Sequence, residues 1–294
     1  MTALCAVPDG DDVVALCGGP YSNFAAVGAF LAATGHIGRR FCLGDIGGFG
    51  PHPDHTLELV RGSNLVCLKG NYDHAVGCDE RDCGCGYVDP RDREFAQISF
   101  DYTAAHTSDH HKHWLRALPD AIEIRWRDAR VLLCHGSPDQ VSEFVWESET
   151  DDAAIDAWLD RFGVVGICAT HSGLPWIRVT QRGFWCNVGV LGRPPHDGTP
   201  RVGYALLRFP RASPSPVPEL VPLTYNPTPV VGAMRDEGLP EAFAQSLEQG
   251  IWTTCAAILP PLERTVAERY TRGSSRPAPS MVTDARHTAA PQSD

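Results

Sequence analysis

The sequence predicts a layered α/β fold, and three features support this. Short apolar runs rich in β-forming residues recur along the chain and end abruptly in Gly, Asp, Asn or His. Their apolar residues are continuous rather than alternating, which is typical of strands buried on both faces. Helical stretches separate several of these runs, and alternation of strands and helices is the pattern of an α/β protein. The predicted strands are residues 13–19, 39–45, 64–71, 130–138 and 164–171.

The helical stretches have recognisable ends. Residues 23–35, NFAAVGAFLAATG, are Ala-rich and are predicted to form a helix that ends at Gly35. Residues 52–62 and 151–163 are predicted helices that precede later strands in the same way. After residue 171 the alternation stops, and three strand candidates follow one another. They are predicted to be antiparallel strands that complete a second sheet, at residues 176–181, 183–190 and 202–209.

The C-terminal part has a different composition. Residues 210–229 are rich in proline and are predicted to be a connector. Residues 238–260 are predicted to form a closing helix, which continues after a proline break. We therefore divide the chain into a main domain at 1–225, a helical extension at 226–271 that packs on it, and a tail at 272–294 that is predicted to be disordered.

Composition excludes several classes of function. The 294 residues are 43% apolar and carry a net charge of −11, which fits a globular protein and argues against a broad nucleic-acid or anionic-membrane surface. The protein could still bind a small anionic substrate, because a bound metal can make the local electrostatic potential positive.

No run is long and apolar enough for a transmembrane helix. Most of the eleven cysteines lie in strand-like runs, as expected of small core residues in a reducing compartment, and we expect a cytoplasmic protein.

Four polar residues each follow a predicted strand. They are Asp45, Asn71, His135 and His171. Open α/β sheets place their binding crevice at such strand ends. One carboxylate, one amide oxygen and two imidazoles form a mixed set of ligands that borderline divalent metals such as Mn, Fe, Zn or Ni accept. A single such residue most often caps or hydrogen-bonds, but four in succession at four strand ends predict a metal site.

The sequence blocks around these residues resemble the calcineurin-like metallophosphoesterases, and most closely their YfcE-like phosphodiesterase branch. The similarity spans about residues 13–208 and includes LGDIGGFGPHPD, KGNYD, CHGSP, THSGLP and NVGVLGRP, in the order of the family. The resemblance implies a four-layer α/β/β/α sandwich, in which helices flank two mixed sheets and the metal site lies at the sheet edges. It also implies a metal-dependent hydrolase of phosphodiester or other small phosphorus-ester substrates.

The sequence departs from the family at the first of its two metals. Where the family has Asp-x-His near the N-terminus, this chain has Gly19 and Tyr21, and Gly173 replaces the second histidine of the late Gly-His-x-His motif. The residues that match the ligands of the second metal are Asp45, Asn71, His135 and His171. Because the losses are confined to one metal, we predict a mononuclear site with open positions for water or substrate.

Three further residues are candidates for catalysis. Tyr72 stands where the family has a histidine, and it either donates a hydrogen bond to an oxyanion or only packs over the metal loop. Asp73 is predicted to orient a metal ligand through a hydrogen bond. Arg193 is predicted to bind a phosphate or carboxylate, with an ion pair to Asp197 as the alternative.

A cysteine-rich loop follows directly. Cys78, Cys83 and Cys85 have a spacing that is not typical of a zinc finger. Three interpretations stay open: a structural turn, a source of thiolates near the missing first metal, and a disulfide or redox element. A second metal is not expected unless these cysteines contribute.

We therefore predict a cytoplasmic, single-metal hydrolase that does not bind nucleic acid or membrane, and we leave a homo-oligomer open. Two alternatives remain on the same scaffold. One is iron-dependent redox or lyase chemistry that uses the 78–85 cysteine loop. The other is a non-catalytic protein that retains a metal and binds a ligand or partner.

Overall fold

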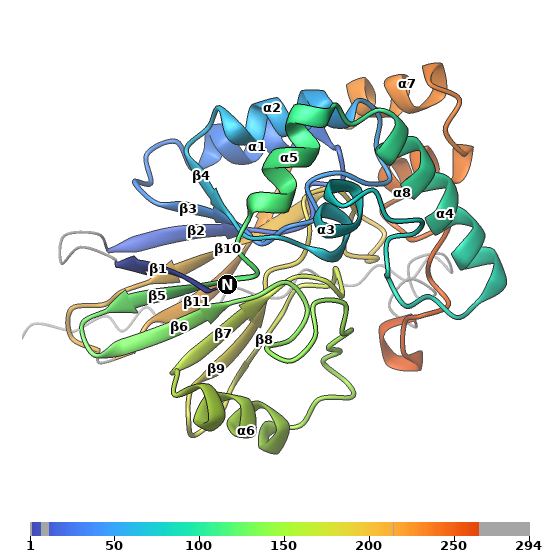
Figure 1. Cartoon of the computed structure of the whole chain (residues 1–294). Helices are drawn as coiled ribbons and strands as arrows, with labels where there is room; N and C mark the ends of the chain where they lie inside the picture. Colours follow the sequence, from blue (N-terminus) through green and yellow to red (C-terminus); the bar gives the residue numbers. More distant parts are fainter. Residues whose placement is uncertain (1, 7–11, 214, 265–294) are drawn as a thin grey trace, which may run out of the picture.

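The structure is a computed structural model that describes residues 2–6, 12–213 and 215–264. Two mixed β-sheets pack face to face and helices cover their outer faces (Figure 1). The six-stranded sheet has the order β1-β5-β6-β7-β9-β8, and the five-stranded sheet has the order β11-β10-β2-β3-β4. This confirms the predicted four-layer α/β/β/α sandwich.

The strands are short, and most of them fall inside the predicted runs. They are β1 (Thr2–Ala6), β2 (Val13–Cys17), β3 (Arg40–Cys42), β4 (Leu65–Cys67), β5 (Ala121–Trp126), β6 (Ala129–Leu133), β7 (Gly166–Ala169), β8 (Trp176–Val179), β9 (Phe184–Asn187), β10 (Val202–Arg208) and β11 (Val217–Leu223).

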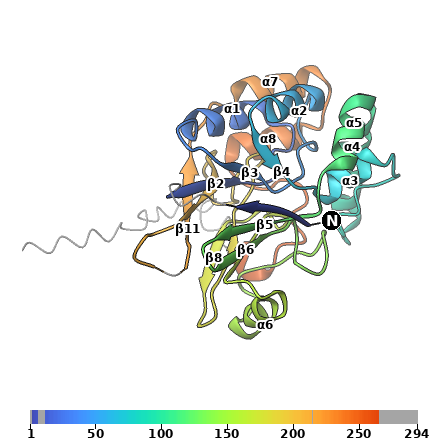
Figure 2. The same ribbon diagram turned by 60° about the vertical axis from the view of Figure 1, so that its left-hand side comes forward.

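The helices lie on the outside of the sandwich and at one end of it (Figures 1 and 2). They are α1 (Phe24–Ala33), α2 (Pro53–Arg61), α3 (Asn71–Gly77), α4 (Pro90–Ala105), α5 (Asp109–Ala117), α6 (Asp152–Phe162), α7 (Thr228–Asp236) and α8 (Glu241–Gln249).

The continuous apolar runs arise because both faces of the central strands are buried. In β2, Val14 and Leu16 belong to the core between the two sheets, whereas Ala15 and Cys17 belong to the core under the helices. In β6, Leu133 faces the other sheet and Leu132 packs in the core that contains Ile155 of α6. Successive side chains of a strand point to opposite faces, so each strand serves two layers at once.

The three late strands are divided between the two sheets, which corrects the prediction that together they complete a second one. β9 pairs parallel with β7, and β8 pairs antiparallel with β9. β10 instead pairs antiparallel with β2 in the five-stranded sheet. The chain therefore returns to the five-stranded sheet after completing the six-stranded sheet.

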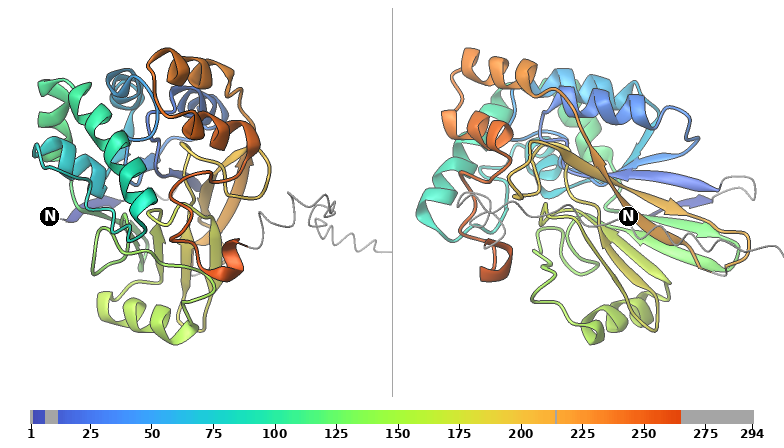
Figure 3. Two further views of the ribbon diagram at one scale, coloured as in Figure 1. Left: turned by 90° about the vertical axis from the view of Figure 1, so that its right-hand side faces the viewer. Right: turned by 180° about the vertical axis from the view of Figure 1, so that it is seen from behind.

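The C-terminal part also differs from its prediction. β11 and the start of α7 lie inside residues 210–229, which were expected to be a connector. The closing helix predicted at 238–260 is only α8, which ends at Gly250 in the left-handed conformation, φ 71°. Residues 250–260 form a non-helical segment that lies beside α4 and α8 at one end of the molecule (Figure 3). The predicted tail at 272–294 lies outside the described residues.

Within the described ranges, no helix has the length and apolar character needed to cross a membrane.

Candidate metal centre

Asp45 lies directly after β3, where the backbone takes an unusual conformation. Its φ is 57°, in the left-handed region that most residues avoid. The carboxylate Oδ1 accepts a hydrogen bond from the backbone N–H of Tyr72 at 3.0 Å. A Cβ on Gly70 would lie 2.1 Å from that Oδ1, so only glycine at position 70 lets the two loops approach this closely.

Asp73 holds these two loops together. Its carboxylate accepts hydrogen bonds from the backbone N–H groups of Asp45 at 2.7 Å, Ile46 at 3.0 Å and Gly70 at 2.9 Å. The predicted orienting role of Asp73 thus corresponds to contacts with the backbone around Asp45 rather than with a histidine. Asp73 is buried, and its hydrogen bonds fix the position of Asp45.

The two histidines come from the six-stranded sheet, after β6 and β7. His135 Nδ1 lies 2.6 Å from the carbonyl oxygen of Leu43, so Nδ1 donates there and Nε2 is the nitrogen that faces the other residues of the cluster. That Nε2 lies 3.1 Å from Asp45 Oδ2 and 3.1 Å from His171 Nδ1. The ligand atoms of Asp45, His135 and His171 all lie within 4.8 Å of one another, and all three residues are buried. The hydrogen bond to Leu43 therefore connects the two sheets at the candidate site.

The charges of the cluster influence one another strongly. Burial acts to raise the pKa of Asp45, but the adjacent His135 outweighs it, so this pKa is lowered. Burial acts to lower the pKa of His135, and the Asp45 carboxylate outweighs it and raises that pKa. Burial and then His135 lower the pKa of His171 to about 3, which keeps this ring neutral at neutral pH and able to ligate. Burial and then the Asp45 charge raise the pKa of Asp73 to about 7.

The side chain of Asn71 has a buried polar atom without a partner. Its amide oxygen, Oδ1, accepts no hydrogen bond within the described chain. Buried polar atoms normally have partners, so this oxygen suggests a ligand. A carboxylate oxygen, imidazole nitrogens and an amide oxygen together fit a divalent transition metal. The four residues predicted from the strand ends are thus compatible with one metal ion.

The residues that replace the first-metal ligands of the family are closely packed. Gly19 has φ 41°, and a Cβ there would lie 2.5 Å from Val190 Cγ1 and 2.9 Å from Tyr21 Cζ. The Tyr21 ring therefore packs beside the backbone position at which the family has an aspartate. Burial and then the charge of Asp45 raise the pKa of Tyr21, so its hydroxyl stays neutral next to the cluster.

The late glycine is closed off in the same way. A Cβ on Gly173 would lie 3.2 Å from the indole ring of Trp252, which comes from the non-helical C-terminal segment. Trp252 is held by hydrogen bonds from its backbone N–H to His196 Nδ1 at 2.7 Å and from its Nε1 to the carbonyl oxygen of Pro194 at 2.8 Å. Side chains of this protein therefore occupy the space next to two of the three replaced ligand positions.

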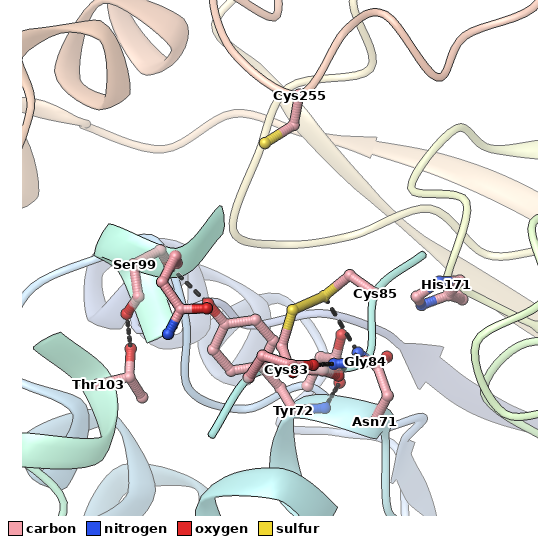
Figure 4. The surroundings of a disulfide bond; sticks show 12 residues. Asn71, Tyr72, Cys83, Gly84, Cys85, Ser99, Thr103, His171 and Cys255 are labelled. Carbon is pink, nitrogen blue, oxygen red and sulfur yellow. Dashed lines mark hydrogen bonds between the residues drawn. A yellow bond between two sulfur atoms is a disulfide. The ribbon is translucent and has the colours of Figure 1, made fainter. Parts of the chain in front are cut away.

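Tyr72 does not have the orientation expected of a catalytic donor. Its hydroxyl lies 2.7 Å from Ser99 Oγ on α4, and its ring makes an edge contact with Phe100. Figure 4 shows Tyr72 directed toward Ser99, on the far side of the view from His171. The ring is 1% exposed. This arrangement favours the packing alternative over hydrogen bonding to a substrate oxyanion.

Arg193 is buried between aromatic rings. Its guanidinium lies 4.2 Å from the ring centroid of Trp252 and 5.5 Å from that of Phe49, and it donates to the carbonyl oxygen of Thr254. The alternative ion pair to Asp197 is not formed, because that carboxylate pairs with Arg201 at 2.9 Å. Within the described residues, Arg193 has no carboxylate at ion-pair distance.

The cysteine loop contacts Asn71, one of the four predicted ligands. Cys83 and Cys85 form a disulfide, whereas Cys78 is a free, exposed thiol. Asn71 Nδ2 donates to the carbonyl oxygen of Cys83 at 2.8 Å and to Cys85 Sγ at 3.2 Å (Figure 4). The disulfide interpretation is the one that the structure shows. It corrects the thiolate alternative, since two of the three thiols are bonded to each other.

The sequence did not indicate which aromatic side chain would cover the cluster. The ring centroid of Phe144 lies 4.5 Å from that of His171, and Phe144 in turn stacks on Trp146 at 5.4 Å. Both residues belong to the long loop between β6 and α6, whose path no local pattern specifies.

Comparisons with known proteins agree with the architecture. No protein-family model matches the chain. Uncharacterized protein MJ0912 of Methanocaldococcus jannaschii is 25% identical over 212 residues, which cover 66% of this chain and 82% of that protein. A crystal structure of a metallophosphoesterase from Sphaerobacter thermophilus is similar with a TM-score of 0.61 at 23% identity, covering 81% of this chain and 99% of the other. This chain has the metallophosphoesterase fold. The hypothetical protein PH1004 from Pyrococcus horikoshii OT3 also has it, with a TM-score of 0.68 at 18% identity over 81% of this chain and 98% of the other.

Proposed function

We propose that this protein is a hydrolase of phosphodiesters or other small phosphorus esters that uses one divalent transition metal. The observation that carries the proposal is the convergence of one carboxylate and two imidazoles, with ligand atoms within 4.8 Å of one another, in a metallophosphoesterase fold. We place the protein in the YfcE-like branch and in the cytoplasm, in keeping with the resemblance of its motifs and with its buried cysteines.

Asp45, His135 and His171 would hold the metal, and Asn71 would add its unpartnered amide oxygen. The bound metal would supply a water of lowered pKa and a Lewis acid for the phosphoryl oxygen. Asp73 keeps Asp45 in place through three backbone hydrogen bonds, and Leu43 fixes which nitrogen of His135 faces the site.

Arg193 is the residue that we propose to attract the anionic group of the substrate. Its guanidinium is buried without a carboxylate partner in the described chain, and it lies close enough to Tyr21 to affect the pKa of that residue. A buried cation without a counter-ion favours binding of an anion. Tyr72 has no catalytic part in this proposal, because its hydroxyl is bonded to Ser99.

Elemental analysis and a variant at His135 test the proposal. We expect about one transition metal per chain in the protein as purified. His135→Ala should lose the metal, and kcat/KM for bis(p-nitrophenyl) phosphate should fall by at least about 100-fold. His113→Ala is the matched control, because His113 is exposed on α5. A His135→Ala variant that kept both its metal and its activity would contradict the proposed site.

A further inference from the structure

The Cys83–Cys85 disulfide is a small ring in the loop between α3 and α4. A single residue, Gly84, separates the two cysteines, and its φ of 61° lies in the left-handed region that favours glycine. Its backbone N–H donates to Asp82 Oδ1 at 2.8 Å, which stabilises the turn. The two cysteines are 6% and 8% exposed, so they are largely covered but lie close to the surface.

A cavity of about 310 Å³ lies next to this ring. Both cysteines line it, together with Asp82, Gly84 and Arg93, which are exposed. Because the lining combines the two sulfur-bearing residues with exposed ones, a small reductant can approach the bond without unfolding of the protein.

The ring contacts one proposed ligand, Asn71, and the residue that follows it lies near Phe144. Asn71 Nδ2 donates to Cys83 O and Cys85 Sγ, and these two contacts fix the rotation of the amide so that Oδ1 is left without a partner. On the other side, a Cβ on Gly86 would lie 3.9 Å from Phe144, whose ring packs on His171. The state of the ring therefore bears directly on one of the four proposed ligands, Asn71.

The oxidation is specific to this loop. Cys17, Cys42 and Cys67 lie in register on three adjacent strands, yet all three are free thiols. Proximity of cysteines thus does not by itself produce disulfides in this protein. A disulfide in a protein that otherwise keeps its thiols reduced is typically transient and redox-sensing.

We propose that Cys83 and Cys85 are a reversible dithiol–disulfide pair that controls the metal affinity of the centre through Asn71. In the reductive step, a thiolate of an external dithiol attacks one sulfur of the pair, and a mixed disulfide forms while the other cysteine leaves and takes up a proton. The second thiolate of the reductant then attacks the reductant sulfur of the mixed disulfide, and the protein cysteine held there leaves and takes up a proton. Two electrons and two protons pass to the pair, and the reductant leaves as its own disulfide.

Reduction removes the constraint on the loop and with it the anchor of the Asn71 amide. Partners that orient a metal ligand are typically worth ten- to a hundredfold in metal affinity. The inference rests on the metal centre of the proposed function but not on its hydrolytic reaction, so metal affinity is the property to measure.

The test uses the full chain, freed of metal and titrated with Mn²⁺, while the signal of the free ion is followed by electron paramagnetic resonance. Mn²⁺ prefers oxygen and imidazole ligands to thiolates, so new thiols do not themselves bind it. One sample is oxidised, and the other is treated with excess dithiothreitol and then freed of it under nitrogen. Alkylation and mass spectrometry count the thiols, and circular dichroism confirms that both samples are folded.

We expect the reduced sample to show two additional thiols, at Cys83 and Cys85, and a Kd for Mn²⁺ raised about tenfold. The Cys83→Ser/Cys85→Ser variant should have the higher Kd for Mn²⁺, that of the reduced wild type, under both conditions. Cys78→Ser, which removes an exposed thiol before the same loop, should respond to reduction as the wild type does. Equal Kd values in the two states, or a bond that is reduced only when the protein unfolds, would overturn the inference but leave the metal centre standing. Absence of Mn²⁺ and Zn²⁺ binding in both states would overturn the metal centre and the inference together.

Discussion

The two sides of the candidate site have opposite characters, although they lie next to each other. On one side, Asp45, His135 and His171 bring ligand atoms together, and a buried amide oxygen lacks a partner. On the other side, Tyr21 and Trp252 fill the space beside the two glycines. An open space beside these two glycines would indicate simple loss of the first-metal ligands. Close packing over the replaced positions instead supports the proposal of a single metal.

The largest effect should come from replacing Asp73, whose carboxylate connects the two loops on the metal-binding side. Asp73→Ala leaves three buried backbone N–H groups without acceptors, and we expect the free energy of unfolding to fall by about 3–5 kcal/mol. Metal content should fall with it, because Asp45 loses its fixed position. Urea denaturation followed by tryptophan fluorescence measures the first effect, and elemental analysis measures the second.

Asp101→Ala is the matched control on the exposed face of α4. Its carboxylate contacts only Gln97 among the hydrogen bonds of the described residues, so stability should change by no more than about 0.5 kcal/mol. If Asp73→Ala were as stable as this control, the loops around Asp45 would have to be held by something other than Asp73.

A methyl group added on the filled side should also destabilise the protein. In Gly19→Ala, the new Cβ would be 2.5 Å from Val190 Cγ1 at a φ of 41°, and we expect a loss of about 2–3 kcal/mol. The matched control is Gly28→Ala on the exposed face of α1, where a Cβ meets no atom within 4 Å. That change should be neutral or stabilise the helix by up to about 1 kcal/mol.

Thermal denaturation of the two alanine variants, together with their metal content, separates the two sides of the site. One metal per chain should persist in Gly19→Ala, because none of the proposed ligands is touched. A Gly19→Ala variant as stable as the wild type would mean that the space beside Tyr21 is open, and the comparison between a filled and a metal-binding side would fail.

The sequence was sufficient to single out Asp45, His135 and His171 as candidate ligands because their positions depend on local patterns. Strands buried on both faces give continuous apolar runs, and the residue after each run lies at a sheet edge. β11 was missed because Pro218 and Pro222 argue against a strand, but β11 is an edge strand with one side unpaired, where proline is tolerated.

The filled side of the site could not be predicted in the same way. Trp252 reaches Gly173 only because the chain leaves α8 at Gly250, where a Cβ would be 2.3 Å from the backbone of Thr199. That contact joins residues about fifty positions apart, and the apolar pattern of 238–260 suits a helix equally well. Likewise, the orientation of Tyr72 depends on Ser99 of α4, a helix whose position no local pattern specifies.

The smallest effect, and the one that assigns Tyr72, is expected from Tyr72→Phe. The change removes the hydroxyl that bonds to Ser99 Oγ but keeps the ring that packs on Phe100. Ser99 Oγ still accepts the backbone N–H of Phe49, so we expect a loss of only about 0.5–1.5 kcal/mol in stability. Activity per bound metal should stay within about twofold of the wild type, because the hydroxyl does not face the ligand cluster.

Ser99→Ala removes the other partner of the same hydrogen bond and also the acceptor for Phe49, so it should cost somewhat more stability than Tyr72→Phe. Steady-state kinetics on bis(p-nitrophenyl) phosphate, normalised to metal content, gives the decisive comparison. A fall in kcat of about 100-fold in Tyr72→Phe with unchanged stability would show that the hydroxyl turns toward substrate, as expected of an oxyanion donor. Tyr72 would then have to be counted with Asp45, His135 and His171 on the metal-binding side of the site.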